Sequence, residues 1–333
     1  MSSQASPFPQ VQAQAGAWTP PPGVTEHTGE PLSAEYDFST SPPADIGEVK
    51  SAYSSVKKGP KLNTRPARIR AAAIAAAVGV GVAIGLEGAA RLLSTLAFET
   101  HIPRPFWALL PGALLAMLFW RLTRSSGTCN FVGSAGCAGF AGAASGGKFI
   151  RHRVLRFKDA EGLAVSVTRH FRQTEYTYTE FSFRWFPPLG EKPCFDIAGS
   201  HGANLEIPPT GNYYNYGRAA EAAWCEYLVP HMDAELAQTG YIRFFAGNKR
   251  WVRLGRGFME IEEADGTVYR SEAAEIGSVK MQSGSLYLTR KEGAPGFFGK
   301  LGESGSFYFD LSTVRNSRLF LLALEKLLGQ KLI

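Results

Sequence analysis

Two apolar runs that follow each other closely constrain the fold of this chain more than any other feature. Residues 71–86 form the first run and residues 106–120 the second, and neither contains a charged side chain. A helix needs about 20 predominantly apolar residues to cross a bilayer. The sequence therefore predicts a two-helix transmembrane hairpin over residues 67–124.

The predicted helices cover about residues 69–98 and 105–122. The first can continue beyond its uncharged part because Glu87 and Arg91 lie four positions apart, in an order that allows them to pair on one helical face. Pro103 breaks the helical pattern between the two runs. The second run is short for a span, so a re-entrant segment and a buried globular hairpin remain open alternatives.

Basic residues surround the predicted hairpin on its outer sides. Six Lys and Arg residues lie between residues 57 and 70, and five lie between 121 and 153, whereas the connecting turn carries two. This distribution predicts an integral membrane protein with both termini in the cytoplasm and membrane lipids as partners. The net charge of +6 lies largely beside the apolar runs, so topology explains it and nucleic-acid binding is disfavoured.

Small residues recur at every fourth position in both runs. The predicted helix-packing residues are Ala73, Ala77, Gly81, Gly85 and Ala89 in the first run, and Ala108, Gly112 and Ala116 in the second. Small residues at this interval let helix backbones approach closely in lipid. The simplest partner is the other helix of the hairpin, and homo-oligomerisation through the same face is the alternative.

The first 66 residues have a composition that is typical of a disordered tail. Pro, Ser, Gln, Gly and Ala dominate residues 1–66, as in SPFPQVQAQAG. Such a composition offers little apolar surface to offset the entropy of ordering the backbone. Scattered aromatic residues, among them Trp18, Tyr36 and Phe38, are interpreted as short docking motifs or as parts of an inert tether.

The rest of the chain predicts two β-rich blocks, residues 127–239 and 240–333. Alternation of apolar and polar residues indicates antiparallel strands, for example in TYTEFSFRWF. Each block has several such strands, followed by one amphipathic helix, predicted at residues 218–229 and 314–328. A terminal helix of this kind can close the open end of a bent sheet.

This order of strands and helix resembles pleckstrin-homology (PH)-like domains of bacterial type, most clearly in the second block. The resemblance rests on AAEIGSVKMQSGSLYLTRK, similar to a strand pair of those domains, and on the helical run LFLLALEKLL. It implies an α+β fold of two tandem PH-like barrels or sheets. It also implies a scaffold that binds proteins, peptides or lipid headgroups, normally without catalysis.

Phosphoinositide-binding PH domains use basic residues around their first strand pair, and the segment NKRWVRLGR lies in the corresponding place. The resemblance therefore implies a candidate lipid or anion site, formed by Lys249, Arg250, Arg253 and Arg256. Charge-assisted hydrogen bonds from such residues suit phosphate oxygens. The alternative is a solvated strand face.

No catalytic, cofactor or metal motif stands out in the sequence. The four cysteines form no CxxC pair, and the six histidines form no HExxH motif. Glu260, Glu262 and Glu263 could act as acid–base groups, but charges on the wet face of a strand explain them more simply.

The preferred function is a membrane-anchored, non-catalytic scaffold. The alternatives are a membrane-associated enzyme with a site at the junction with lipid, and a small-residue helical transport assembly.

Overall fold

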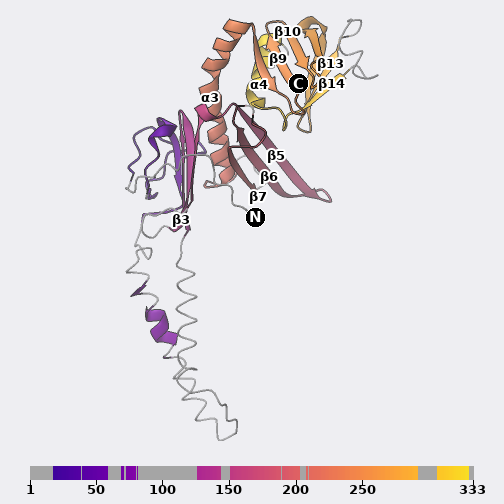
Figure 1. Cartoon of the computed structure of the whole chain (residues 1–333). Coiled ribbons are helices and arrows are strands. Elements are labelled where there is room, and N and C mark those ends of the chain that lie inside the picture. The colour runs from indigo at the N-terminus through magenta and orange to yellow at the C-terminus, as the bar shows by residue number, and fades with distance from the viewer. Residues whose placement is uncertain are drawn as a thin grey trace.

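The structure, a computed structural model, contains two successive units with the same order of elements, named here repeat 1 and repeat 2 (Figure 1). Each has a four-stranded antiparallel sheet, a short 3-10 turn, a three-stranded antiparallel sheet and a helix. The residues that the structure describes are 18–38, 40–58, 69–70, 73–79, 81, 126–143, 151–188, 190–202, 208, 210–291 and 306–329.

Repeat 2 shows the order in its simplest form. Its elements are β8 (Tyr241–Phe245), β9 (Trp251–Gly255), β10 (Phe258–Glu262), β11 (Val268–Glu272), the 3-10 turn Ala273–Glu275, β12 (Ile276–Gln282), β13 (Ser285–Arg290), β14 (Ser306–Asp310) and α4 (Ser317–Leu328). The sheets have the orders β11-β10-β9-β8 and β12-β13-β14. The several antiparallel strands that alternation predicts in residues 240–333 are confirmed, and there are seven of them.

Repeat 1 follows the same order but begins earlier in the chain than the sequence suggests. Its elements are β1 (Val49–Ser54), β2 (Ser126–Gly133), β3 (Gly136–Ala143), β4 (Arg151–Arg156), the 3-10 turn Phe157–Asp159, β5 (Gly162–Arg172), β6 (Glu175–Phe186), β7 (Phe195–His201) and α3 (Tyr213–Thr239). Strand β1 pairs antiparallel with β2, so both apolar runs lie between the first two strands of one sheet. In repeat 2, only residues 246–250 separate the equivalent strands β8 and β9.

The prediction of a disordered tail over residues 1–66 is wrong for most of its length. A short 3-10 turn (Ala44–Ile46) precedes β1, and residues 18–38, named here the cover segment, pack on one face of the first sheet. The apolar residues of that segment pack on β2 and β3, which lie far away in the sequence, so the composition of the segment alone does not reveal this packing. Residues 1–17 lie outside the described residues.

The prediction of a two-helix transmembrane hairpin over residues 67–124 also needs correction. Among the described residues, no helix is long and apolar enough to cross a membrane. This finding contradicts the predicted fold class, the two-span localisation and the cytoplasmic placement of both termini. The described helical residues, 69–70, 73–79 and 81, include many alanines, whose small side chains contribute little apolar area. The second predicted helix, 105–122, lies outside the described residues.

The predicted helix-packing residues are only partly described. Ala73, Ala77 and Gly81 are helical and exposed. The remaining five lie outside the described residues: Gly85, Ala89, Ala108, Gly112 and Ala116.

The four-stranded sheet of repeat 1 is covered on both faces, which explains its small, apolar sequence. Phe131 and Phe140 face the cover segment, where they pack with Phe38. Cys137, on the opposite face, packs with α3 and the strands β5–β7. A Cβ atom on Gly133 would lie 2.2 Å from the carbonyl oxygen of Ile46, so only glycine fits this close approach.

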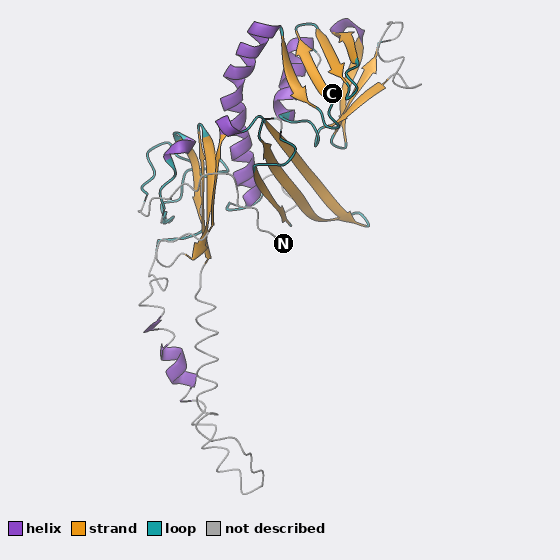
Figure 2. Ribbon diagram, in the orientation of Figure 1, coloured by secondary structure: helices purple, strands orange, loops and turns teal. Residues whose placement is uncertain are grey.

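Helix α3 serves both repeats. Figure 2 shows its lower half between the two sheets of repeat 1 and its upper half beside the sheets of repeat 2. Its first half buries Tyr216 and Trp224 in the core of repeat 1, and Met232 and Leu236 in its second half pack against the core of repeat 2. The helix continues through Pro230, although the predicted helix ends at residue 229. Packing of both halves on separate cores outweighs the hydrogen bond that proline removes.

Asn316 joins the two repeats just before α4. Its Oδ1 accepts hydrogen bonds from the backbone N–H of Leu163, at 2.9 Å, and from Nε1 of Trp224, at 2.8 Å. Its own N–H donates to the carbonyl oxygen of Leu163 at 2.7 Å. The residue has a φ of 58°, a left-handed conformation that asparagine tolerates better than most residues. One side chain of repeat 2 therefore satisfies donors from a strand and a helix of repeat 1.

We expect Asn316→Ala to lower the free energy of unfolding by about 3 kcal/mol, because two N–H groups lose their acceptor and alanine is strained at this φ. Urea unfolding of the full chain measures the change. Asn316→Asp keeps an acceptor oxygen and tolerates the backbone conformation, so we expect a clearly smaller loss. Equal losses in the two variants would contradict this role of the side-chain oxygen.

Candidate functional site

The outer face of the sheet β8–β11 in repeat 2 carries a connected set of ion pairs. Alternation turns Ile242 and Phe244 of β8 into the core, and the same holds for Val252 and Leu254 of β9. The residues between them point outward. The outward-facing charged residues, named here the arginine–glutamate ladder, are Arg243, Arg253, Glu260, Glu262, Arg270 and Glu272.

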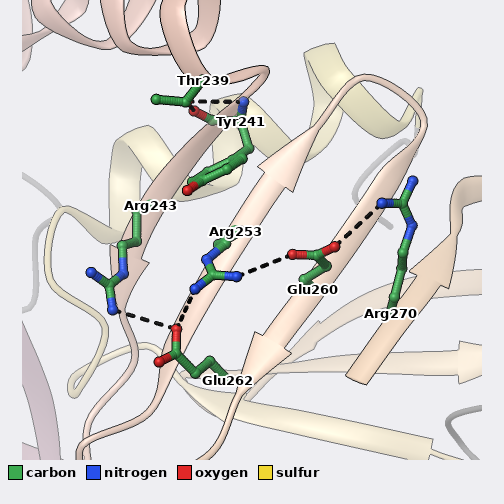
Figure 3. Close-up of polar contacts among 7 residues, drawn as sticks. All are labelled: Thr239, Tyr241, Arg243, Arg253, Glu260, Glu262 and Arg270. Carbon is green, nitrogen blue, oxygen red and sulfur yellow. Dashed lines mark hydrogen bonds and ion pairs between the residues drawn. The ribbon is translucent and has the colours of Figure 1, made fainter. Parts of the chain in front are cut away.

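Ion pairs connect the ladder across all four strands (Figure 3). Glu262 accepts from Arg243 at 3.4 Å and from Arg253 at 2.6 Å. Glu260 accepts from Arg253 at 3.4 Å and from Arg270 at 3.3 Å. Arg243 and Arg253 are direct cross-strand neighbours, and the Glu262 carboxylate between them offsets their repulsion.

The centre of the ladder is more protected from water than its ends. The side chains of Arg253 and Glu260 are 24% and 18% exposed, whereas that of Arg270 is 51% exposed. Solvent screens the outer pairs strongly, so the central pairs contribute most to the order of the face. At the outer end, Arg270 Nε donates a hydrogen bond to the Glu272 carboxylate at 2.9 Å, and this bond raises the pKa of the Arg270 guanidinium.

Each arginine of the ladder contacts an aromatic ring. The guanidinium carbon of Arg243 lies 3.9 Å from the ring centroid of Trp251, and that of Arg270 lies 3.9 Å from the ring of Phe258. Arg253 lies 5.4 Å from the ring of Tyr241. Each distance is within the range of a cation–π contact.

The start of the ladder sheet is anchored to the end of α3. Thr239 Oγ1 donates to the carbonyl oxygen of Tyr241 at 2.7 Å and accepts from its N–H at 3.3 Å, as Figure 3 shows. Glu235 of α3 accepts from the N–H of Arg243, and burial raises the pKa of this carboxyl group. These contacts fix the first strand of the face against a helix.

The ladder has no net charge, and its side chains are already ordered. Three arginines face three glutamates, so the formal charges cancel, and both partners of each ion pair are held in place before any ligand arrives. Binding to a surface that is already ordered loses less side-chain entropy. Exposed tryptophan, tyrosine and arginine are the residue types most often found at the centre of protein interfaces.

The structure does not bring the four predicted anion-binding residues together. Arg253 belongs to the ladder, and Arg250 forms an ion pair with Glu263 at 3.0 Å. Lys249 and Arg256 are exposed in the turns at opposite ends of β9. Two of the four charges are therefore neutralised, and the other two are separated by the length of a strand.

Sequence reasoning found part of the ladder and missed its connections. Glu260 and Glu262 lie on the outward face of β10, whereas Glu263, the third glutamate of that interpretation, follows the strand. The sequence pattern does not single out Arg243 and Arg270. The alternation of charged residues with Ile242, Ile261 and Ser271 was the available signal, but it does not reveal which strands are neighbours.

Other reactive groups in the described residues do not form a centre. No group of three or more His, Cys, Asp or Glu side chains there could hold a metal ion. Burial raises the pKa of Cys137 and of Cys225 to about 12, so neither is a thiolate near neutral pH. His152 and His170 lie on different sheets, and His170 stacks on Tyr178 with ring centroids 4.3 Å apart.

Comparison with known proteins does not assign this chain to a family. No protein-family model matches the sequence, and no curated protein is significantly similar to it.

Proposed function

We propose that this chain is a non-catalytic binding protein, built from two PH-like modules, whose arginine–glutamate ladder binds a segment of another protein. The order of four strands, three strands and one helix, present twice, supports the PH-like assignment. The observation that carries the binding function is the difference between the outer faces of the two four-stranded sheets.

In repeat 1, an extended part of the chain itself covers this face. Thr25 of the cover segment accepts from the N–H of Ala52 in β1 at 2.9 Å, and its own N–H donates to the carbonyl oxygen of Lys50 at 3.1 Å. Aromatic side chains of the segment fill the face. The sheet therefore accepts an extended segment along an edge strand, with side chains laid across its outer face.

In repeat 2, the equivalent face carries the ladder, and its arginines at positions 243 and 270 remain exposed. Because the ladder is electrically neutral, it does not favour a polyanion such as nucleic acid. Its mixture of aromatic rings, arginines and glutamates suits a protein segment that has both charged and apolar side chains. A protein ligand is therefore the partner that this chemistry supports best.

A matched pair of double variants tests the proposal. Arg243→Ser with Trp251→Ser removes one stacked pair from the ladder, whereas Phe171→Ser with Arg172→Ser removes exposed residues of the same types from the β5–β6 hairpin. A partner captured by the full chain is purified, and its Kd is measured for each variant. We expect the ladder variant to bind at least about thirtyfold more weakly and the hairpin variant to bind normally. Equal Kd values for the ladder variant and the unmodified chain would reject the ladder as the binding surface.

A further inference from the structure

A cleft lies between the two repeats. It has a volume of about 390 Å³ and is lined by residues of β5 and β6, of the β8–β9 turn and of the segment before α4. Pockets that bind small molecules have volumes of about 300–1,000 Å³. The cleft is therefore of a size that suits a small molecule rather than an extended polypeptide.

Arg315 is the best-ordered cation in this cleft. Its guanidinium carbon lies 4.3 Å from the ring centroid of Phe186 in repeat 1 and 4.5 Å from that of Phe245 in repeat 2. Nη2 donates to the carbonyl oxygen of Gly190 at 2.8 Å. The side chain also packs on Gly162, where a Cβ atom would lie 2.7 Å from its Cδ. These contacts hold a cationic group in one position before any ligand binds.

Two further cations line the cleft from opposite sides. Arg184 comes from β6 of repeat 1 and Lys249 from the β8–β9 turn of repeat 2, where its φ is 60°. Within the described part of the chain, neither side chain has an ion-pair partner. Glu191 is the acidic residue of the lining, so three cations face one carboxylate. This excess contrasts with the ladder, in which every arginine is paired.

We infer that this inter-repeat cleft binds the phosphate group of a small molecule. Arginine presents a planar fork of donors that matches phosphate oxygens, and lysine supplies a compact positive charge. Phe186 and Phe245 also line the cleft, and their rings contact the Arg315 guanidinium. Neither repeat forms the site alone, since Arg184 belongs to one repeat and Lys249 to the other. The inference does not depend on the binding function of the ladder.

Titration calorimetry of the purified full chain at low salt tests this site. The probes are inorganic phosphate, pyrophosphate and glycerol 3-phosphate, and phosphatidylcholine vesicles containing phosphatidic acid are tested separately by sedimentation. The variant Arg184→Gln with Lys249→Gln removes two exposed charges from the cleft. We expect it to weaken phosphate binding by at least about tenfold.

A control variant removes the same number of charges elsewhere. Arg256→Gln with Lys280→Gln changes two exposed residues outside the cleft and should bind the probes as the unmodified chain does. Loss of soluble-phosphate binding in the cleft variant alone supports a free phosphate compound, and loss of vesicle binding in that variant alone supports a lipid headgroup. The inference fails if no probe binds saturably, or if the cleft and control variants bind equally.

Discussion

Replacing Phe38 with alanine should lower the free energy of unfolding by about 3–5 kcal/mol, the usual cost of removing a buried phenyl ring. Phe38 is 3% exposed, and its ring centroid lies 5.0 Å from that of Trp18 and 5.7 Å from that of Phe131 in β2. The ring therefore joins the cover segment to the sheet. Its loss opens a cavity on a face that is otherwise apolar, and urea unfolding of the full chain measures the cost.

Phe171→Ala is the matched control for this prediction. Phe171 is 61% exposed on the β5–β6 hairpin, so the same substitution should change the free energy of unfolding by no more than about 0.5 kcal/mol. Hydrogen exchange gives a second readout, because the N–H of Ala52 donates to Thr25 of the cover segment. This N–H should exchange faster in Phe38→Ala. Similar stabilities for the two variants would show that the segment does not depend on its aromatic anchor.

The cover segment shows why composition misled the sequence reasoning. Its prolines and glycines resemble those of a disordered tail, and its apolar residues are too sparse to form a core by themselves. Val24, Tyr36 and Phe38 are nevertheless buried, because a sheet distant in sequence supplies the apolar surface that they lack. Trp18, Tyr36 and Phe38 pack in a core of repeat 1, so a packing role replaces both the docking-motif and the tether interpretation.

The sequence did not predict strand β1, where repeat 1 begins, for a different reason. Strand β1 is only six residues long, and its partner β2 begins at Ser126, beyond both apolar runs. Pairing between strands that are this far apart leaves no local periodicity to detect. In repeat 2 the first six strands follow one another closely, 15 residues separate the sixth from the seventh, and alternation is visible within each strand. Only part of the ladder can be predicted, because alternation identifies the outward-facing residues of a strand, whereas their cross-strand neighbours depend on the register of the strands.

Acidification should destabilise the docked cover segment through His27. This side chain is partly buried between β1 and α3: Nδ1 lies 2.9 Å from Ser51 Oγ, and the imidazole centroid lies 5.2 Å from the Tyr216 ring. Burial lowers the pKa of His27 to about 3, from an ordinary value of 6.5. Desolvation is the cause, and within the described residues no carboxylate offsets it. Protonation therefore requires the segment to expose this ring to water.

The direction of the pH effect follows from the lowered pKa. Between about pH 6.5 and pH 3, the unfolded chain binds a proton at His27 that the folded chain does not bind, so stability falls as the pH falls. This group alone should cost about 2 kcal/mol between pH 7 and pH 5. Urea unfolding at both pH values should show that His27→Gln loses about 2 kcal/mol less than the unmodified chain over this interval. His231→Gln changes an exposed histidine of α3 and should behave like the unmodified chain. If all three proteins lose the same stability between pH 7 and pH 5, His27 is not the group that couples docking of the segment to pH.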